Sequence, residues 1–197
     1  MKNIHRFPHS VRVIENSWIP MSDGCRLAAR IWLPADAETA PVPAILEYIP
    51  YRKRDFTRPR DEPMHHYFAG YGYAAVRVDL RGSGDSDGLL LDEYSKQEHD
   101  DALEVIRWIG QQPWCSGAVG MMGKSWGGFN SLQVAARRPP ELKAIITVCS
   151  TDDRYLDDVH YMGGCLLNEN LTWGSVLMSY NAYPPDPELV GERWRAM

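Results

Sequence analysis

Short apolar runs alternate with amphipathic stretches along most of the chain. Residues 11–20 alternate between apolar and polar side chains, and residues 26–33 repeat this pattern after the turn signal Ser22-Asp23-Gly24. Alternation on both sides of a turn predicts an antiparallel hairpin. Mostly apolar runs follow, each short enough for one buried strand, at residues 43–49, 73–80, 118–122 and 143–149.

Helical patterns separate these runs. We expect helices over residues 62–71, 93–111 and 126–137. In the second helix the apolar residues Ala102, Val105, Ile106 and Ile109 follow the i, i+3, i+4, i+7 spacing of one buried stripe. Strands that alternate with helices form βαβ units, so the fold class is α/β, with a mostly parallel sheet that begins in an antiparallel hairpin.

The composition and the hydrophobic pattern of the chain change after Ser150. Residues 151–197 are rich in Tyr, Trp, Asn and Met, and they contain short helical stretches and no strong strand pattern. We therefore divide the chain into a core over residues 1–150 and the beginning of a mainly helical region over residues 151–197.

Composition limits the partners. The chain has 21 Lys and Arg against 26 Asp and Glu, with a net charge of -5. The basic stretch Arg52-Lys53-Arg54 is followed by acidic residues and is interpreted as a solvated loop. A nucleic-acid surface needs clustered basic residues, so none is expected.

Membrane and metal sites are also not expected. The chain has no apolar run of the length, about 18 residues, that a spanning helix needs. Residues 1–20 contain no apolar signal-peptide core, so a cytoplasmic location is predicted. The cysteines stand far apart and are expected to be small buried residues rather than zinc ligands; they are Cys25, Cys115, Cys149 and Cys165.

The strongest chemical signal is the turn Gly123-Lys124-Ser125-Trp126-Gly127, between an expected strand and an expected helix. This is the G-x-S-x-G pattern of a nucleophilic serine held in a strained turn. Side chains in place of either glycine would collide with each other and with the neighbouring strand. The backbone N–H of Trp126 then lies at a helix N-terminus and can stabilise an oxyanion. Ser125 as a simple N-cap would leave the two glycines unexplained.

Two phosphate-binding interpretations fail on spacing. A Walker A loop that ends in Gly123-Lys124-Ser125 would need glycine at Ala118. A dinucleotide fingerprint that starts at Gly82 would need glycine at Asp87. No cofactor is therefore expected.

With the nucleophile turn in place, four stretches together resemble the X-Pro dipeptidyl-peptidase and cocaine-esterase-like (CocE/NonD) family of serine hydrolases. They are IPYRKRD at 49–55, VDLRGSGDSDG at 78–88, WIGQQPWCSG at 108–117 and GMMGKSW at 120–126. Their order and spacing match the family to about Cys149. The resemblance implies an α/β-hydrolase fold whose helical region after residue 150 begins a cap.

The resemblance also implies site roles. Tyr51 would donate its hydroxyl to the oxyanion beside the N–H of Trp126, although a packed loop aromatic remains the alternative. Trp126 replaces the tyrosine that is usual after the family's nucleophile, so the pocket shape can differ. Asp79 and Arg81 are expected to pair and to hold the glycine-rich turn.

The base and acid of a triad are not evident. His160 is the single histidine after Ser125, and the family places its acid and histidine farther along the chain. We expect the nearby acidic residues to cap and solvate helices rather than to join a triad; they are Asp152, Asp153, Asp157 and Asp158. The adjacent His65 and His66 diverge on a helix and form no metal site. The chain is therefore interpreted as an N-terminal piece with negligible turnover by itself.

The leading hypothesis is a serine hydrolase that cleaves ester or amide bonds, X-Pro dipeptidyl bonds included, through an acyl-enzyme on Ser125. Its partner would be a small-molecule ester or amide, or a peptide. Two other functions remain open: a non-catalytic binding domain on a hydrolase scaffold, and an acyltransferase that uses the same residues.

Overall fold

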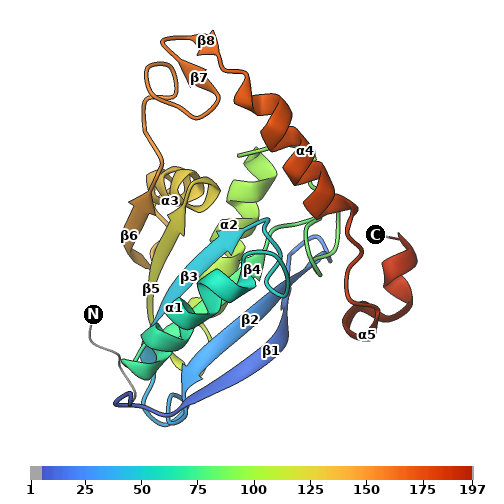
Figure 1. Cartoon of the computed structure of the whole chain (residues 1–197). Helices are drawn as coiled ribbons and strands as arrows, with labels where there is room; N and C mark the ends of the chain where they lie inside the picture. Colours follow the sequence, from blue (N-terminus) through green and yellow to red (C-terminus); the bar gives the residue numbers. More distant parts are fainter. Residues whose placement is uncertain (1–5, 197) are drawn as a thin grey trace.

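A six-stranded mixed sheet organises the computed structural model, which describes residues 6–196 (Figure 1). The strand order is β1-β2-β4-β3-β5-β6. The hairpin β1–β2 pairs antiparallel with β4, and the four strands β4, β3, β5 and β6 are mutually parallel. The strands are β1 Val11–Pro20, β2 Arg26–Pro34, β3 Val42–Ile49, β4 Ala74–Asp79, β5 Cys115–Lys124 and β6 Leu142–Val148.

Helices cover the two faces of this sheet. Helix α1 (Arg58–Gly70) packs on β2 and β4, whereas α2 (Lys96–Gly110) and α3 (Trp126–Ala136) pack together on the other side, against β3 and β5. The apolar stripe expected on α2 is buried. The α/β class and the antiparallel start of the sheet are thus confirmed.

The ends of two helices differ from the sequence prediction. Helix α1 begins at Arg58 rather than at residue 62, with a proline in its first turn, where the missing N–H has no partner to lose. Helix α2 begins at Lys96 because the Ser95 side chain accepts the backbone N–H of Glu98 and caps the helix. A proline in the first turn marks the start of α1 and a side-chain cap marks the start of α2, whereas hydrophobic spacing alone indicates neither.

Strand β6 departs from the expectation that the parallel strands are buried on both faces. Ile146 is 60% exposed and Val148 is also exposed. Beside them an apolar groove runs from α1 across the sheet, lined by residues that include Tyr67, Met122 and Ile145. In the part of the chain that the structure describes, no helix covers this face of β5 and β6.

Residues 151–160 form turns and bends, and a small hairpin that the sequence did not predict follows them. The hairpin is formed by β7 (Tyr161–Met162) and β8 (Cys165–Leu166). Helix α4 (Glu169–Ala182) then passes over the carboxyl ends of the parallel strands (Figure 1). Helix α5 (Pro187–Val190) and the 3₁₀ turn Gly191–Ala196 complete the segment.

The basic stretch after β3 is not a solvated loop, so this prediction was wrong. Arg52 and Lys53 are buried. Lys53 Nζ lies 2.5 Å from Asp85 Oδ2, and Arg52 donates to the carbonyl oxygens of Tyr183 and Pro184, both at 2.8 Å. The basic side chains thus join the β3–α1 loop to the glycine-rich loop and to the chain after α4.

Three further expectations can be compared with the structure. Cys115 is buried and Cys25 half-buried, but Cys149 and Cys165 are exposed, so the prediction of buried cysteines was wrong for these two. Within residues 6–196, no three His, Cys, Asp or Glu side chains gather as a metal site would require. None of the helices in the same range has the length and apolar character needed to cross a membrane.

Candidate active site

Ser125 forms a one-residue turn between β5 and α3. Its backbone φ is 57° and its ψ is -118°, a strained combination for a residue with a side chain. The Ser125 N–H donates to Val148 of β6 at 2.8 Å, and its carbonyl accepts from Gly128 and Phe129. The side chain makes no cap hydrogen bond. The N-cap interpretation therefore fails.

The two flanking glycines are needed for close approach. A Cβ on Gly123 would lie 2.3 Å from the carbonyl carbon of Gly127 and 2.4 Å from its Cα. A Cβ on Gly127 would lie 2.8 Å from Cγ2 of Ile49 on the neighbouring strand. The collisions expected from the sequence are confirmed: Gly123 is crowded by backbone, and Gly127 by a side chain of the neighbouring strand.

Tyr51 lies two residues beyond the end of β3 and is mostly buried. Its ring meets Trp126 edge to face at 6.4 Å, and meets Trp173 of α4 in the same way at 5.9 Å. Burial raises the pKa of Tyr51 far above its ordinary value, while a side-chain hydrogen bond with Ser125 acts in the opposite direction. At neutral pH the phenol is therefore protonated beside Ser125, and it can donate a hydrogen bond.

A small cavity collects these groups at the carboxyl edge of the sheet. The core contributes Ser125, Trp126 and Tyr51, and the segment after β6 closes the cavity from above. The complete lining is Tyr51, Glu93, Tyr94, Ser125, Trp126, Val159, His160, Glu169 and Trp173.

His160 reaches this cavity but is held by two carboxylates. Its Nδ1 lies 2.9 Å from Glu169 Oε1, and its Nε2 lies 3.2 Å from Glu93 Oε2. The Trp173 indole donates to the other oxygen of Glu93 at 2.8 Å. Both ring nitrogens of His160 thus face carboxylates, and neither is placed to take a proton from Ser125 in this arrangement.

The other described histidines lie away from the cavity. His65 is buried under α1 with its Nε2 at 2.9 Å from Glu47, and His99 contacts Gln133 at the same distance. Of the acidic residues after β6, Asp153 accepts the N–H groups of a turn rather than of a helix, and Asp158 is buried and faces Arg154. The expectation that Asp158 is solvated was wrong.

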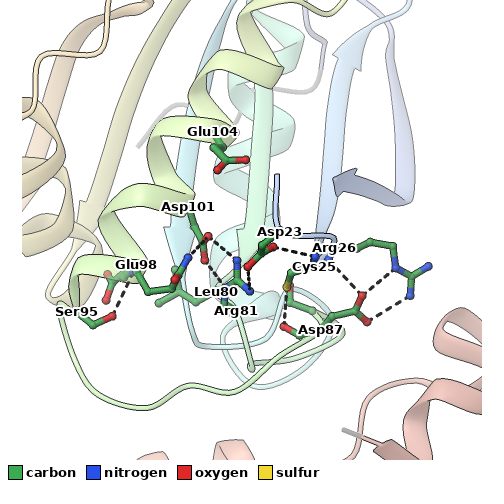
Figure 2. A network of polar contacts seen from close by, with 12 residues as sticks. Asp23, Cys25, Arg26, Leu80, Arg81, Asp87, Ser95, Glu98, Asp101 and Glu104 are labelled. Atoms are coloured by element: carbon green, nitrogen blue, oxygen red, sulfur yellow. Dashed lines mark hydrogen bonds and ion pairs between the residues drawn. The ribbon is translucent and has the colours of Figure 1, made fainter. Parts of the chain in front are cut away.

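Asp79 and Arg81 do not pair, which corrects the sequence expectation. The Asp79 carboxylate accepts the backbone N–H groups of Lys53 at 2.7 Å and of Asp85 at 3.2 Å. Arg81 instead binds Asp101 of α2 with two nitrogens and also meets Asp23 at 2.8 Å (Figure 2). Asp79 thus fixes the loop that carries Tyr51, while Arg81 joins the glycine-rich turn to α2.

Sequence reasoning missed Glu93, Glu169 and Trp173 as cavity residues. They come from the loop before α2 and from α4, and no motif or spacing links these segments. The sequence pattern expected α2 to begin at residue 93, which would have placed Glu93 on a helix rather than in the cavity wall.

Comparison with known proteins identifies relatives of this chain. The sequence profile of the X-Pro dipeptidyl-peptidase (S15) family matches residues 23–196. A putative serine esterase from Mycobacterium bovis is 34% identical over 163 residues, covering 75% of this chain and 26% of the relative. Cocaine esterase from a Rhodococcus species is 36% identical over 167 residues, covering 84% of this chain and 28% of the relative. The chain thus spans about a quarter of the length of these relatives.

Solved structures show the same fold. A CocE/NonD family hydrolase from Staphylococcus aureus superposes with a TM-score of 0.75 at 24% identity, over 94% of this chain and 36% of the other. An α-amino acid ester hydrolase gives a TM-score of 0.71 at 24% identity, over 92% of this chain and 32% of the other. Both place the chain in the α/β-hydrolase fold.

Proposed function

Because the chain belongs to the X-Pro dipeptidyl-peptidase (S15) family, we propose that it carries the nucleophile and the oxyanion hole of a serine hydrolase. The nucleophile is Ser125. The oxyanion donors are the Tyr51 hydroxyl and the backbone N–H of Trp126. The bond that is cleaved is an ester or an amide.

The reaction proceeds in two halves. The Ser125 hydroxyl gives its proton to the catalytic base as its oxygen attacks the carbonyl carbon, and the negative oxygen that forms accepts hydrogen bonds from Tyr51 and from the Trp126 N–H. Collapse of this intermediate breaks the bond to the leaving group, which takes the proton from the base and departs as the alcohol or amine, and an acyl group stays on Ser125. Water then attacks the acyl carbon, and the acid product leaves.

The observation that carries the proposal is the strained backbone of Ser125, in a turn where a Cβ on Gly123 would collide with the backbone of Gly127. A non-catalytic binding domain has no need of a serine held at φ 57°. The buried, protonated Tyr51 beside the same hydroxyl supports a hydrolase further. An acyltransferase would use the same groups and differ only in the acceptor that replaces water.

The proton-accepting base is a histidine other than His160. Glu93 and Glu169 occupy both nitrogens of His160, and no other histidine among residues 6–196 reaches the cavity. We therefore expect the isolated 197-residue chain to turn over an activated ester negligibly. Residues 151–197 act as part of a cap above the cavity.

The substrate class follows from the walls of the cavity. Aromatic rings of Tyr51, Tyr94, Trp126 and Trp173 surround Ser125, so the acyl group that enters has an apolar part. Small-molecule esters and amides fit this description, and so do peptides with a prolyl residue, as the names of the relatives suggest.

A fluorophosphonate probe tests the proposal in the protein as its gene encodes it. We expect labelling that is lost in Ser125→Ala and kept in Ser175→Ala, whose hydroxyl bonds only to its own helix. Well-folded protein that takes up no probe would reject the hydrolase in favour of the binding domain.

A further inference from the structure

Glu98 is a buried carboxylate of α2 that the proposed mechanism does not use. It is 4% exposed, and its partners within residues 6–196 are three neutral N–H groups. One oxygen accepts from Trp126 Nε1 at 2.9 Å and from Asn130 Nδ2 at 3.3 Å. The other accepts from the backbone N–H of Tyr94 at 2.9 Å.

Asp101, one turn further along α2, is a buried carboxylate that has a cation as its partner. Its two oxygens receive Arg81 at 2.7 and 2.8 Å, so its charge is balanced by a cation (Figure 2). Buried carboxylates are usually paired in this way because an unpaired charge is costly to remove from water. Glu98 has no such cation, and its place in the fold needs another reason.

The donors around Glu98 supply that reason. Trp126 and Asn130 are one turn apart on α3, and Trp126 is its first residue. The Tyr94 ring packs on Trp126 at 5.2 Å. Glu98 therefore joins the first turn of α3, through the Trp126 indole, to the loop that lines the cavity.

We propose that Glu98 is a positioning residue, whose carboxylate holds the Trp126 indole and thereby orients the backbone N–H that binds the oxyanion. The inference rests on the proposed function. It adds a second role for the side chain of Trp126, which would anchor the helix start through its indole.

The hydrogen bonds that the Glu98 carboxylate accepts depend on pH. Burial raises the pKa of Glu98 to about 7, although hydrogen bonds from Trp126, Asn130 and Tyr94 oppose the shift, and Glu93 adds to it. The ionised carboxylate offers acceptors to all three donors, whereas the acid carries a proton on one oxygen. Other titratable and charged groups nearby are Tyr94, Tyr48, Asp101, Arg81, Cys25 and, across the Tyr94 ring, Arg154; α3 faces Glu98 with neutral groups.

The experiment measures the acylation rate of Ser125 by a fluorophosphonate against pH, in the protein as its gene encodes it. Below pH 7 the rate should fall by about tenfold more than titration of the base alone would give, because protonation of Glu98 also weakens its hold on the Trp126 indole. Glu98→Gln should remove this additional fall and lower the plateau about tenfold, as expected for a misplaced donor.

Two further variants make the result specific. Glu104→Gln changes a half-buried carboxylate of the same helix, which accepts a hydrogen bond from Ser22, and should leave the profile unchanged. Trp126→Phe keeps Glu98 but removes the indole donor, so it should also remove the additional fall even if Glu98→Gln folds poorly.

Fluorine NMR of protein labelled with fluorotryptophan provides a measurement that does not depend on the reaction of Ser125. The Trp126 resonance should shift with a midpoint near pH 7, and Glu98→Gln should abolish the shift. A reactive Ser125 whose pH profile ignores Glu98→Gln and Trp126→Phe would overturn this inference alone, as would a Trp126 resonance that does not titrate. A Ser125 that reacts at no pH would contradict the proposed function itself.

Discussion

Replacement of Gly123 by alanine puts a single methyl group into the narrowest part of the nucleophile turn. The new Cβ would stand 2.3 Å from the carbonyl carbon of Gly127 and 2.4 Å from its Cα. Carbon atoms that are not bonded prefer separations of about 3.5–4.0 Å. The obstacle is backbone, so the turn itself must move by more than about 1 Å.

The size of the effect can be graded within the same chain. Overpacking costs about 1–3 kcal/mol, and we place Gly123→Ala at about 3 kcal/mol, the upper end, because no side chain can rotate away. Gly127→Ala meets only Cγ2 of Ile49, and should cost about 1 kcal/mol. Gly174→Ala, on α4 with nothing within 4 Å, should be neutral or stabilising by up to about 1 kcal/mol.

Urea denaturation followed by circular dichroism gives the three free energies of unfolding. We expect the order Gly123→Ala, Gly127→Ala, Gly174→Ala from most to least destabilised, and a Ser125 in Gly123→Ala that no longer reacts with a fluorophosphonate. A Gly123→Ala protein within about 1 kcal/mol of the wild type, at an unchanged denaturant slope, would refute the steric account of the turn.

Three other predictions concern the groups around the turn. Tyr51→Phe should slow acylation of Ser125 about 10²-fold with the melting temperature preserved, because one oxyanion donor is lost; stopped-flow kinetics measures the rate. Lys53→Met removes the nearer of the two cations of the buried Asp85 carboxylate and leaves Arg54 at 4.0 Å; it should cost about 3 kcal/mol in thermal unfolding, part of which Lys53→Met with Asp85→Asn restores. Burial raises the pKa of Glu47, but Arg77 and His65 more than offset this, so the net pKa lies below 4.5. The stability that the ionised Glu47 supplies is therefore present above pH 4.5 and is lost as pH falls through the lowered pKa. Glu47→Gln should make acid denaturation less dependent on pH in this range.

A specific result would contradict each of these three predictions. An unchanged acylation rate in Tyr51→Phe would leave Tyr51 as a packed aromatic. A Lys53→Met protein as stable as the wild type would mean that Asp85 reaches water. An acid unfolding curve of Glu47→Gln that parallels the wild type would assign the acid sensitivity to other carboxylates.

The elements and the nucleophile turn were predictable because their causes are local. Ser125 and its two glycines stand within five consecutive residues, and the buried stripe of α2 repeats with the period of a helix. The start of α2 was missed because Ser95 caps it three residues later than the apolar pattern suggests. Strand β6 was expected to be covered on both faces because its sequence is apolar. An apolar sequence does not show which neighbouring elements cover each face, and Ile146 and Val148 are exposed.

The surroundings of the site depend on contacts between distant segments. Lys53 is buried because Asp85, 32 residues away, meets its ammonium group, and Arg52 binds carbonyls more than 130 residues along the chain. The same holds for His160, which was visible as a lone histidine while its partner Glu93 was not. Residue types alone do not indicate these pairings.

The most direct test of the central claim is to trap the acyl-enzyme. The protein as its gene encodes it is mixed with an activated ester that deacylates slowly, denatured at once, and mapped by mass spectrometry of its peptides. The account predicts one acyl group, on Ser125, and less of it in Tyr51→Phe. Consumption of the ester with the acyl group on another residue, or with Ser125 unmodified at every time point, would contradict it.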